Sequence, residues 1–244
     1  GAVELNLIAQ DTSIYGQDIG MENGLPELLE QLHEIEGLEW IRVLYQYPAG
    51  ITNRLIEAMT QLDKVVAYLD MPIQHVNNQI LERMRRPERK DQIVDLIERL
   101  RNAMPEVVLR TTLIAGFPGE TDEQFEEMLE FVQWARFDAL GCFPYYAEDG
   151  TEAATMPEQI DTETKQRRVE AIMLAQQEIA FEKCTTRQAR QLRVLVEGPD
   201  ARNRLIGRYY GQAPETDSVC IFEEAWTSPG EFVPAVVTGR QDYD

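Results

Sequence analysis

The chain has 244 residues, which allows one large domain or a large domain followed by a small one. No apolar run approaches the roughly 18 residues of a membrane span, and residues 1–6 lack the basic start of a signal peptide, so we expect a cytoplasmic protein without membrane contact. Acidic residues outnumber basic ones 43 to 23, and the formal charge of −20 opposes nonspecific binding to nucleic acid and favours a basic partner. Acidity also serves solubility alone, so charge does not decide between these two interpretations.

Strand-like and helix-like segments alternate through the first 145 residues. Apolar runs predict five strands, over 3–9, 40–45, 65–70, 107–115 and 137–145. Between them apolar residues recur at helical spacing, and Thr121 with Gln124 predicts a capping box at the start of one helix. Strands that are apolar on both faces and separated by helices favour a parallel sheet covered by helices. A complete eight-unit barrel needs about 250 residues, so we expect a partial (β/α) barrel in this α/β chain.

The pattern changes after residue 160. Residues 161–188 predict one long polar helix that connects two domains. Short alternating segments then follow at 192–196, 219–222 and 232–237, with turns at Gly198–Pro199 and Pro229–Gly230. They predict a small all-β, OB-like barrel over 189–244, after a barrel domain over 1–160.

Polar residues gather where the predicted strands end. Ligands bind at the carboxyl ends of parallel strands, and glycines there let the backbone approach a ligand closely. Some of these residues have plainer interpretations. The segment Gly116–Gly119 also fits a turn before a capped helix, His75 an ordinary loop histidine, and Arg110 a partner for a neighbouring carboxylate. Taken together, the five polar strand ends predict a site for a polar ligand.

Four segments resemble the radical S-adenosylmethionine (SAM) methylthiotransferases. They are Gln-Asp-Thr-Ser-Ile-Tyr-Gly at 10–16, Leu-Asp-Met-Pro-Ile-Gln-His at 69–75, Arg-Thr-Thr-Leu-Ile-Ala-Gly-Phe-Pro-Gly-Glu-Thr at 110–121, and Gln-Asp-Tyr-Asp at 241–244. Residues 1–160 are similar to the family's radical domain, and 189–244 to its C-terminal TRAM domain. Within the family, the chain resembles most the branch that modifies a ribosomal protein.

The resemblance implies a reaction and a cofactor pocket. Family members add a methylthio group to an unactivated carbon, in this branch the β-carbon of an aspartate in ribosomal protein S12. One 4Fe-4S cluster cleaves SAM to a radical that abstracts hydrogen, and a second cluster is involved in sulfur delivery. By position in the family's motifs, the SAM pocket is expected to contain Gln10, Asp11, Arg42, Gln74, His75, Arg110, Ile114 and Gly116.

The cluster ligands of the family have no match in this chain. The catalytic cluster needs three converging cysteines in a C-x-x-x-C-x-x-C loop, whereas Cys142, Cys184 and Cys220 lie far apart in sequence. We therefore expect that this chain ligates neither 4Fe-4S cluster, that the first β-α unit and a further domain lie upstream of Gly1, and that the chain alone is inactive.

Three other functions stay open. One is the family's tRNA branch, which modifies an adenosine, although residues 189–244 hold nine acidic residues against six arginines and no lysine, and a tRNA-binding module should be basic. A second is a binding module for S12 or SAM without turnover. The third is a metal-free barrel enzyme, for which the strand ends offer only Asp11, Asp70, His75 and Glu120 as acid–base groups.

Overall fold

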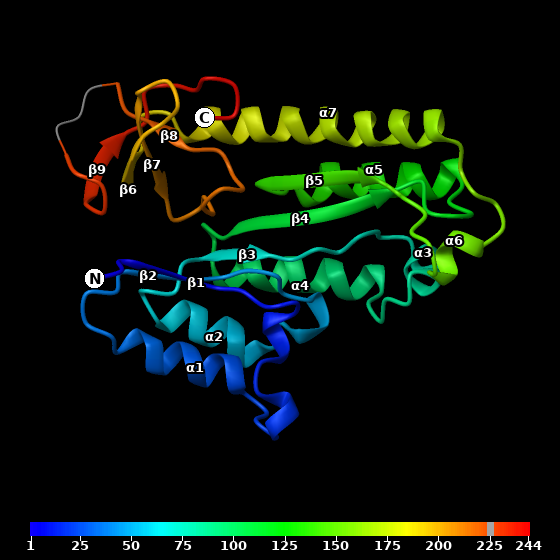
Figure 1. Ribbon diagram of the computed structural model, residues 1–244, viewed down its shortest axis with the longest axis horizontal. Helices are drawn as coiled ribbons and strands as arrows, with labels where there is room; N and C mark the ends of the chain where they lie inside the picture. The colour runs from blue at the N-terminus through cyan, green and yellow to red at the C-terminus, as the bar shows by residue number, and fades with distance from the viewer. Residues whose placement is uncertain (224–226) are drawn as a thin grey trace.

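The computed structural model describes residues 1–223 and 227–244. Its first part alternates strands and helices as the sequence predicts (Figure 1). The elements are β1 (Glu4–Leu7), η1 (Thr12–Ile14), η2 (Gln17–Ile19), α1 (Gly24–His33), β2 (Trp40–Val43), η3 (Pro48–Gly50), α2 (Asn53–Gln61), β3 (Tyr68–Asp70), α3 (Asn78–Arg83), α4 (Lys90–Ala103), β4 (Val108–Ala115), α5 (Asp122–Ala135), β5 (Ala139–Pro144), α6 (Glu152–Thr155) and α7 (Thr162–Arg187).

The five strands run parallel, which confirms the predicted sheet. β1 pairs with β2, and β3, β4 and β5 form a second ladder in chain order. A parallel bridge between Ile41 and Val65 joins the two ladders. All five carboxyl ends therefore lie at one edge of a curved layer, and we call this the carboxyl edge.

Helices cover the outer face of the strands. Alternate strand residues such as Leu5, Ile41 and Leu109 point to this side and pack against residues of α1, α2, α4 and α5. Helix α7 runs along β5 and α5 and contributes Val169 and Ile172 to the same core (Figure 1). The long helix expected over 161–188 thus also covers the sheet, in addition to connecting the two parts of the chain.

The C-terminal part, which we call the β-module (residues 189–223 and 227–244), is an antiparallel sheet. Its described strands are β6 (Gln191–Pro199), β7 (Leu205–Tyr209), β8 (Cys220–Ile221) and β9 (Phe232–Val236), in the order β8-β7-β6-β9. The all-β prediction is confirmed, and β7 is an additional strand. The sequence analysis missed β7 because Gly207 and Arg208 interrupt its apolar alternation.

The β-module packs on the inner face of the parallel strands, near their amino ends. Trp40, Tyr68 and Val108 form one buried cluster with Leu195 and Ala213 of the β-module. The ring of Trp40 meets that of Phe232 edge-on, with centroids 4.7 Å apart. The amino half of the inner face is therefore closed by the β-module, and the carboxyl half is left for other contacts.

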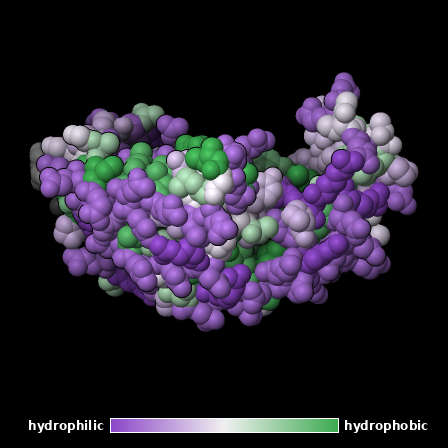
Figure 2. Space-filling view, turned by 90° about the horizontal axis from the view of Figure 1, so that it is seen from below, coloured by the Kyte–Doolittle hydropathy of each residue, from purple (hydrophilic) through white to green (hydrophobic). Residues whose placement is uncertain are grey.

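Figure 2 shows a mostly hydrophilic surface on the side that carries α1 and α2, with small apolar patches. This agrees with helices whose apolar faces point to the core. Among the described residues, no helix combines the length and the apolar character needed to cross a membrane.

Candidate functional site at the carboxyl edge

The inner face has three levels, because strand residues alternate between the two sides of a sheet. Nearest the amino ends is the apolar cluster that meets the β-module. A charged level follows, with Arg42 on β2, Asp70 on β3 and Arg110 on β4, and Asp70 and Arg110 are register partners. The carboxyl edge itself forms the third level, where the sequence predicts the ligand site.

Gln74 lies at this edge in a strained conformation. Its φ angle is +66°, a left-handed value that side chains other than glycine rarely adopt. Two backbone bonds hold it, from Gln74 N to the carbonyl of Thr112 (2.9 Å) and from Ile114 N to the carbonyl of Gln74 (2.8 Å). Strain of this kind persists where the surroundings fix it, and it clusters at ligand sites.

Three amide side chains near the carboxyl ends of successive strands have buried atoms without a hydrogen-bond partner among the described residues. They are Oδ1 of Asn6 on β1, both amide atoms of Gln46 after β2, and Oε1 of Gln74 after β3. An unsatisfied buried polar atom costs about 1–3 kcal/mol, so a row of them favours a polar ligand. The sequence analysis missed Asn6, whose signal was one amide inside an apolar run.

The loop after β4 approaches α7 closely. Gly116 has a φ angle of +74°, and a Cβ added to it would lie 2.4 Å from Cγ of Lys165. Only glycine fits both conditions. Thr121 also caps α5 with a reciprocal capping box to Gln124, so the plainer interpretation of this segment as a turn before a capped helix holds as well.

Glu120 fixes the position of the loop after β4. Its fully buried carboxylate accepts hydrogen bonds from Gly116 N (2.9 Å) and from Arg168 Nη1 on α7 (2.7 Å). His75 Nε2 lies 3.3 Å from the same carboxylate, and His75 Nδ1 accepts a hydrogen bond from Asn77 N (3.0 Å). Nε2 faces Glu120 without forming a hydrogen bond, and it has no hydrogen-bond partner among the described residues. The sequence predicts His75 in the pocket, and the structure places its buried ring beside Glu120 under the loop after β4.

Arg42, which the sequence predicts in the SAM pocket, contacts both the strands and the β-module. Its side chain is fully buried, with Nε donating to Glu4 Oε1 (3.1 Å) and Nη1 donating to the carbonyl of Tyr210 in the β-module (2.7 Å). Its guanidinium lies over the ring of Tyr68, 4.7 Å from the centroid. Burial lowers the pKa of Arg42, and the adjacent Glu4 carboxylate opposes that shift. Arg42 thus joins the two parts of the chain.

Arg110 pairs with neighbouring carboxylates, as one interpretation of the sequence suggests. Nη1 lies 2.8 Å from Asp70 Oδ1, and Nε lies 3.4 Å from Asp217 Oδ1 in the β-module. Burial alone would lower the pKa of Arg110, but the charge of Asp70 beside it raises that pKa above its ordinary value. Arg110 therefore lies in the charged level, below the carboxyl edge.

The other expected residues lie at or near the edge. Gln10 is exposed, and Ile114 packs in a small apolar cluster with Phe117 and Tyr145. Asp11 caps η1, where its Oδ1 accepts a hydrogen bond from Ser13 N (2.9 Å).

Each of the four acid–base candidates of a metal-free enzyme has at least one polar contact within the chain. Asp11 caps a turn, Asp70 pairs with Arg110, and Glu120 and His75 support the loop after β4. His75 Nε2 is nevertheless buried without a hydrogen-bond partner among the described residues, so these contacts leave general acid–base catalysis a prediction.

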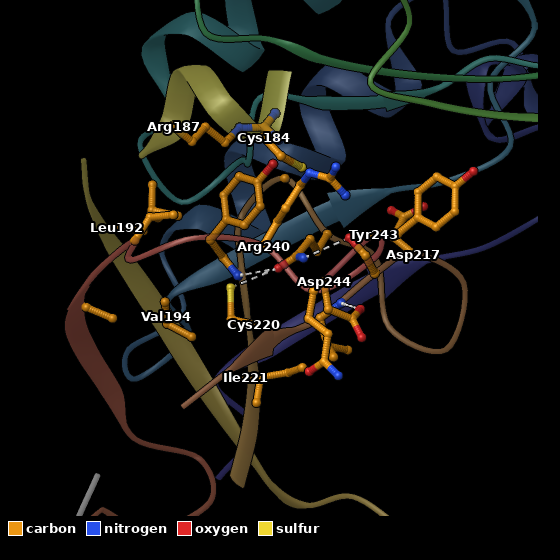
Figure 3. Close-up of a pocket in the computed structure, with 18 of the residues that line it drawn as sticks. Cys184, Arg187, Leu192, Val194, Asp217, Cys220, Ile221, Arg240, Tyr243 and Asp244 are labelled. Carbon is orange, nitrogen blue, oxygen red and sulfur yellow. Dashed lines mark hydrogen bonds between the residues drawn. The ribbon is translucent and has the colours of Figure 1, made fainter. Parts of the chain in front are cut away.

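The cysteines do not form a set of cluster ligands. Cys142 is buried on β5, and burial raises the pKa of its thiol to about 12. Cys184 on α7 and Cys220 on β8 line a cavity of about 1210 Å³ between α7 and the β-module (Figure 3). Over residues 1–223 and 227–244, no group of three or more His, Cys, Asp or Glu side chains is placed to hold a metal ion. The described residues therefore do not fit an iron–sulfur cluster, which needs converging thiolates.

Comparison with known proteins covers both parts of the chain. The model of the radical SAM superfamily matches residues 6–132, and that of the TRAM domain matches residues 190–244. The ribosomal protein uS12 methylthiotransferase RimO of Caldicellulosiruptor saccharolyticus is 44% identical over 245 residues, covering 100% of this chain and 56% of that protein. The protein of the same name from Bdellovibrio bacteriovorus is 42% identical over 251 residues, covering 100% and 55%. The chain spans about half the length of these curated relatives.

The fold agrees with a solved structure. Coproporphyrinogen III oxidase HemN of Escherichia coli, described as a radical SAM enzyme, superimposes with a TM-score of 0.55 at 14% identity. The match covers 85% of this chain and 52% of HemN, and it concerns the fold alone. The parallel strands, their polar carboxyl edge and the match over residues 6–132 lead to one conclusion: the chain belongs to the radical SAM superfamily.

Proposed function

We propose that this chain carries the SAM-binding part and the β-module of a methylthiotransferase that acts on the β-carbon of an aspartate in ribosomal protein S12, in the cytoplasm. The buried amide groups of Gln46 and Gln74 carry the proposal, because they lie at the carboxyl edge of a radical SAM sheet and have atoms without a hydrogen-bond partner among the described residues. The identity of 42–44% along the whole chain to proteins named uS12 methylthiotransferase supports the choice of substrate.

The residues at the carboxyl edge fit SAM as a ligand. Gln74 at the edge and Asn6 in the level below it, beside Arg42, offer buried acceptors to its ammonium and hydroxyl groups. Gly116 lets the backbone approach, and Ile114 offers an apolar contact. Gln10 completes this set at the exposed rim. SAM, when reductively cleaved, supplies the radical that abstracts hydrogen from the substrate. The role of this chain is to bind and orient SAM.

Gln74→Ala is expected to weaken SAM binding about tenfold, because a hydrogen bond to a charged group contributes about 1.5–3 kcal/mol and tenfold corresponds to about 1.4 kcal/mol. Isothermal titration calorimetry of the chain with SAM measures this. Gln31→Ala, on the exposed face of α1, is the matched control and should leave Kd unchanged. Equal affinities for both variants, or no SAM binding by the unaltered chain, would contradict the proposal.

The charge of the chain supports a basic protein substrate over tRNA. The β-module carries nine acidic residues and six arginines, and several of the described arginines are already paired. Arg190, Arg193 and Arg204 lie in ion pairs with Glu106, Glu39 and Asp200. Few cations are therefore free for phosphates, whereas the net charge of −20 would steer a basic protein towards the chain.

We propose further that the chain by itself ligates neither cluster and does not cleave SAM, so that in isolation it acts only in binding. The reason is the placement of its three cysteines on β5, α7 and β8. Anaerobic reconstitution with iron and sulfide should give no stoichiometric absorbance of a 4Fe-4S cluster. A redox-active 4Fe-4S cluster bound at one per chain would contradict this part of the proposal.

A further inference from the structure

A continuous series of polar contacts runs from the β-module to the carboxyl edge. Asp217 Oδ1 lies 3.4 Å from Arg110 Nε, and Arg110 Nη1 lies 2.8 Å from Asp70 Oδ1. The second oxygen of Asp70, Oδ2, accepts a hydrogen bond from Tyr45 N (3.2 Å). Asp217 in the loop between β7 and β8, Arg110 on β4 and Asp70 on β3 thus link the β-module to the backbone just after β2.

The segment at the end of this series is strained. Tyr45 has a φ angle of +55°, a left-handed value for a bulky residue, and its side chain is exposed at the carboxyl edge. Its amide is held by Asp70 Oδ2, and the next amide, Gln46 N, donates to the Asp70 carbonyl (2.9 Å). The carbonyl of Tyr45 accepts from Thr12 N (3.0 Å) and Thr12 Oγ1 (3.1 Å). Such a conformation persists only where several contacts fix it together.

Asp217 is itself held firmly at the other end. Its carboxylate is nearly buried, and Oδ2 accepts hydrogen bonds from Ala213 N (2.8 Å) and from the hydroxyl of Tyr68 (2.7 Å). Burial, and then the charge of Asp217, raise the pKa of Tyr68, so its hydroxyl stays protonated and donates. These contacts leave Oδ1 directed at Arg110 on the inner face, and Figure 3 shows Asp217 beside the cavity under the β-module.

We infer that Asp217 of the β-module is a positioning residue for the ligand site at the carboxyl edge. It orients Arg110, Arg110 aligns Asp70, and Asp70 fixes the strained backbone of Tyr45 and Gln46 beside the SAM site. The inference rests on the proposed function for the identity of the ligand. It adds that the β-module sets the conformation of the SAM site, so events at the two places are coupled.

The test compares Asp217→Asn with Glu39→Gln in the full chain. Glu39 forms the other kind of contact between the two parts, an exposed ion pair with Arg193 at 2.7 Å. We expect Asp217→Asn to speed hydrogen exchange at the amides of Tyr45 and Gln46, and to raise the Kd for SAM about tenfold. Glu39→Gln should change neither, and Asp217→Glu, which keeps the charge, should recover most of both.

The outcomes separate this inference from the proposed function. Unchanged exchange at Tyr45 and Gln46 in Asp217→Asn overturns the inference. An equal rise at the Ile41 amide of β2 also overturns it, because that would show general loosening of the strands. Absence of SAM binding by the unaltered chain overturns the proposed function, and the exchange measurement still decides the inference. Equal exchange in Asp217→Asn and Glu39→Gln also overturns the inference.

Discussion

Replacing Glu120 with glutamine is expected to lower the free energy of unfolding by about 3–5 kcal/mol, the cost of leaving one partner of a buried ion pair alone. The Glu120 carboxylate is fully buried, and the variant leaves the guanidinium of Arg168, itself 5% exposed, without its buried charge partner. The amide of Gly116 and the ring of His75 lose the same carboxylate. The loop after β4 should therefore loosen together with the loss of stability.

The chain contains a control with the same arginine and the same distance. Arg168 Nη2 lies 2.7 Å from Asp122 Oδ1, as Nη1 lies 2.7 Å from Glu120, but the side chain of Asp122 is 86% exposed. An exposed pair contributes about 0–1 kcal/mol, so Asp122→Asn should be nearly neutral. Urea unfolding followed by circular dichroism measures both. Similar losses for the two variants would show that burial of Glu120 does not matter.

Glu4→Gln is expected to cost a similar amount, about 3–5 kcal/mol, and to weaken the contact between the strands and the β-module. The Glu4 carboxylate forms ion pairs with two buried guanidiniums. Its Oε1 lies 3.1 Å from Arg42 Nε of β2, and its Oε2 lies 2.5 Å from Arg208 Nη2 of β7. Burial alone would lower the pKa of Arg208, and hydrogen bonds with Glu4 and then Glu197 raise it above its ordinary value. Both arginines stay charged in the variant and lose a buried counter-ion.

Limited proteolysis and urea unfolding test this second expectation. Cleavage near the end of α7 should become faster in Glu4→Gln, because the β-module separates from the strands more often. Glu106→Gln is the matched control, since Glu106 also pairs across the two parts, with Arg190 at 3.3 Å, but its side chain is 75% exposed. A Glu4→Gln variant as stable and as resistant as Glu106→Gln would contradict the assigned role of Glu4.

The sequence predicts the fold well because each strand and helix has its own pattern of apolar residues within a short stretch of the chain. Alternation and helical spacing placed five strands and the long helix, and all are present. Strand β7 is not predicted, because Gly207 interrupts its alternation of apolar and polar residues. The strand is stabilised by its antiparallel pairing with β6, which the local sequence does not show.

The candidate site was predictable only in part. Strand-end position places Gln74 and Gly116 at the carboxyl edge, where the structure has them too, and their contact with SAM stays a prediction. The partners of Arg42 could not be predicted, since one of them, the carbonyl of Tyr210, is 168 residues away in sequence. For His75, the decisive neighbour is Glu120, and only the fold brings the two together.

Helix α7 gives the glycine at position 116 a mechanical consequence. The helix has 26 residues and is therefore about 39 Å long, with the contact to Gly116 in its first turn and the β-module attached just beyond its last. A side chain at position 116 would press on this first turn. Because α7 packs along β5 and α5 and its side chains belong to the core, the resulting strain would be shared between the ligand edge and the core beneath the helix.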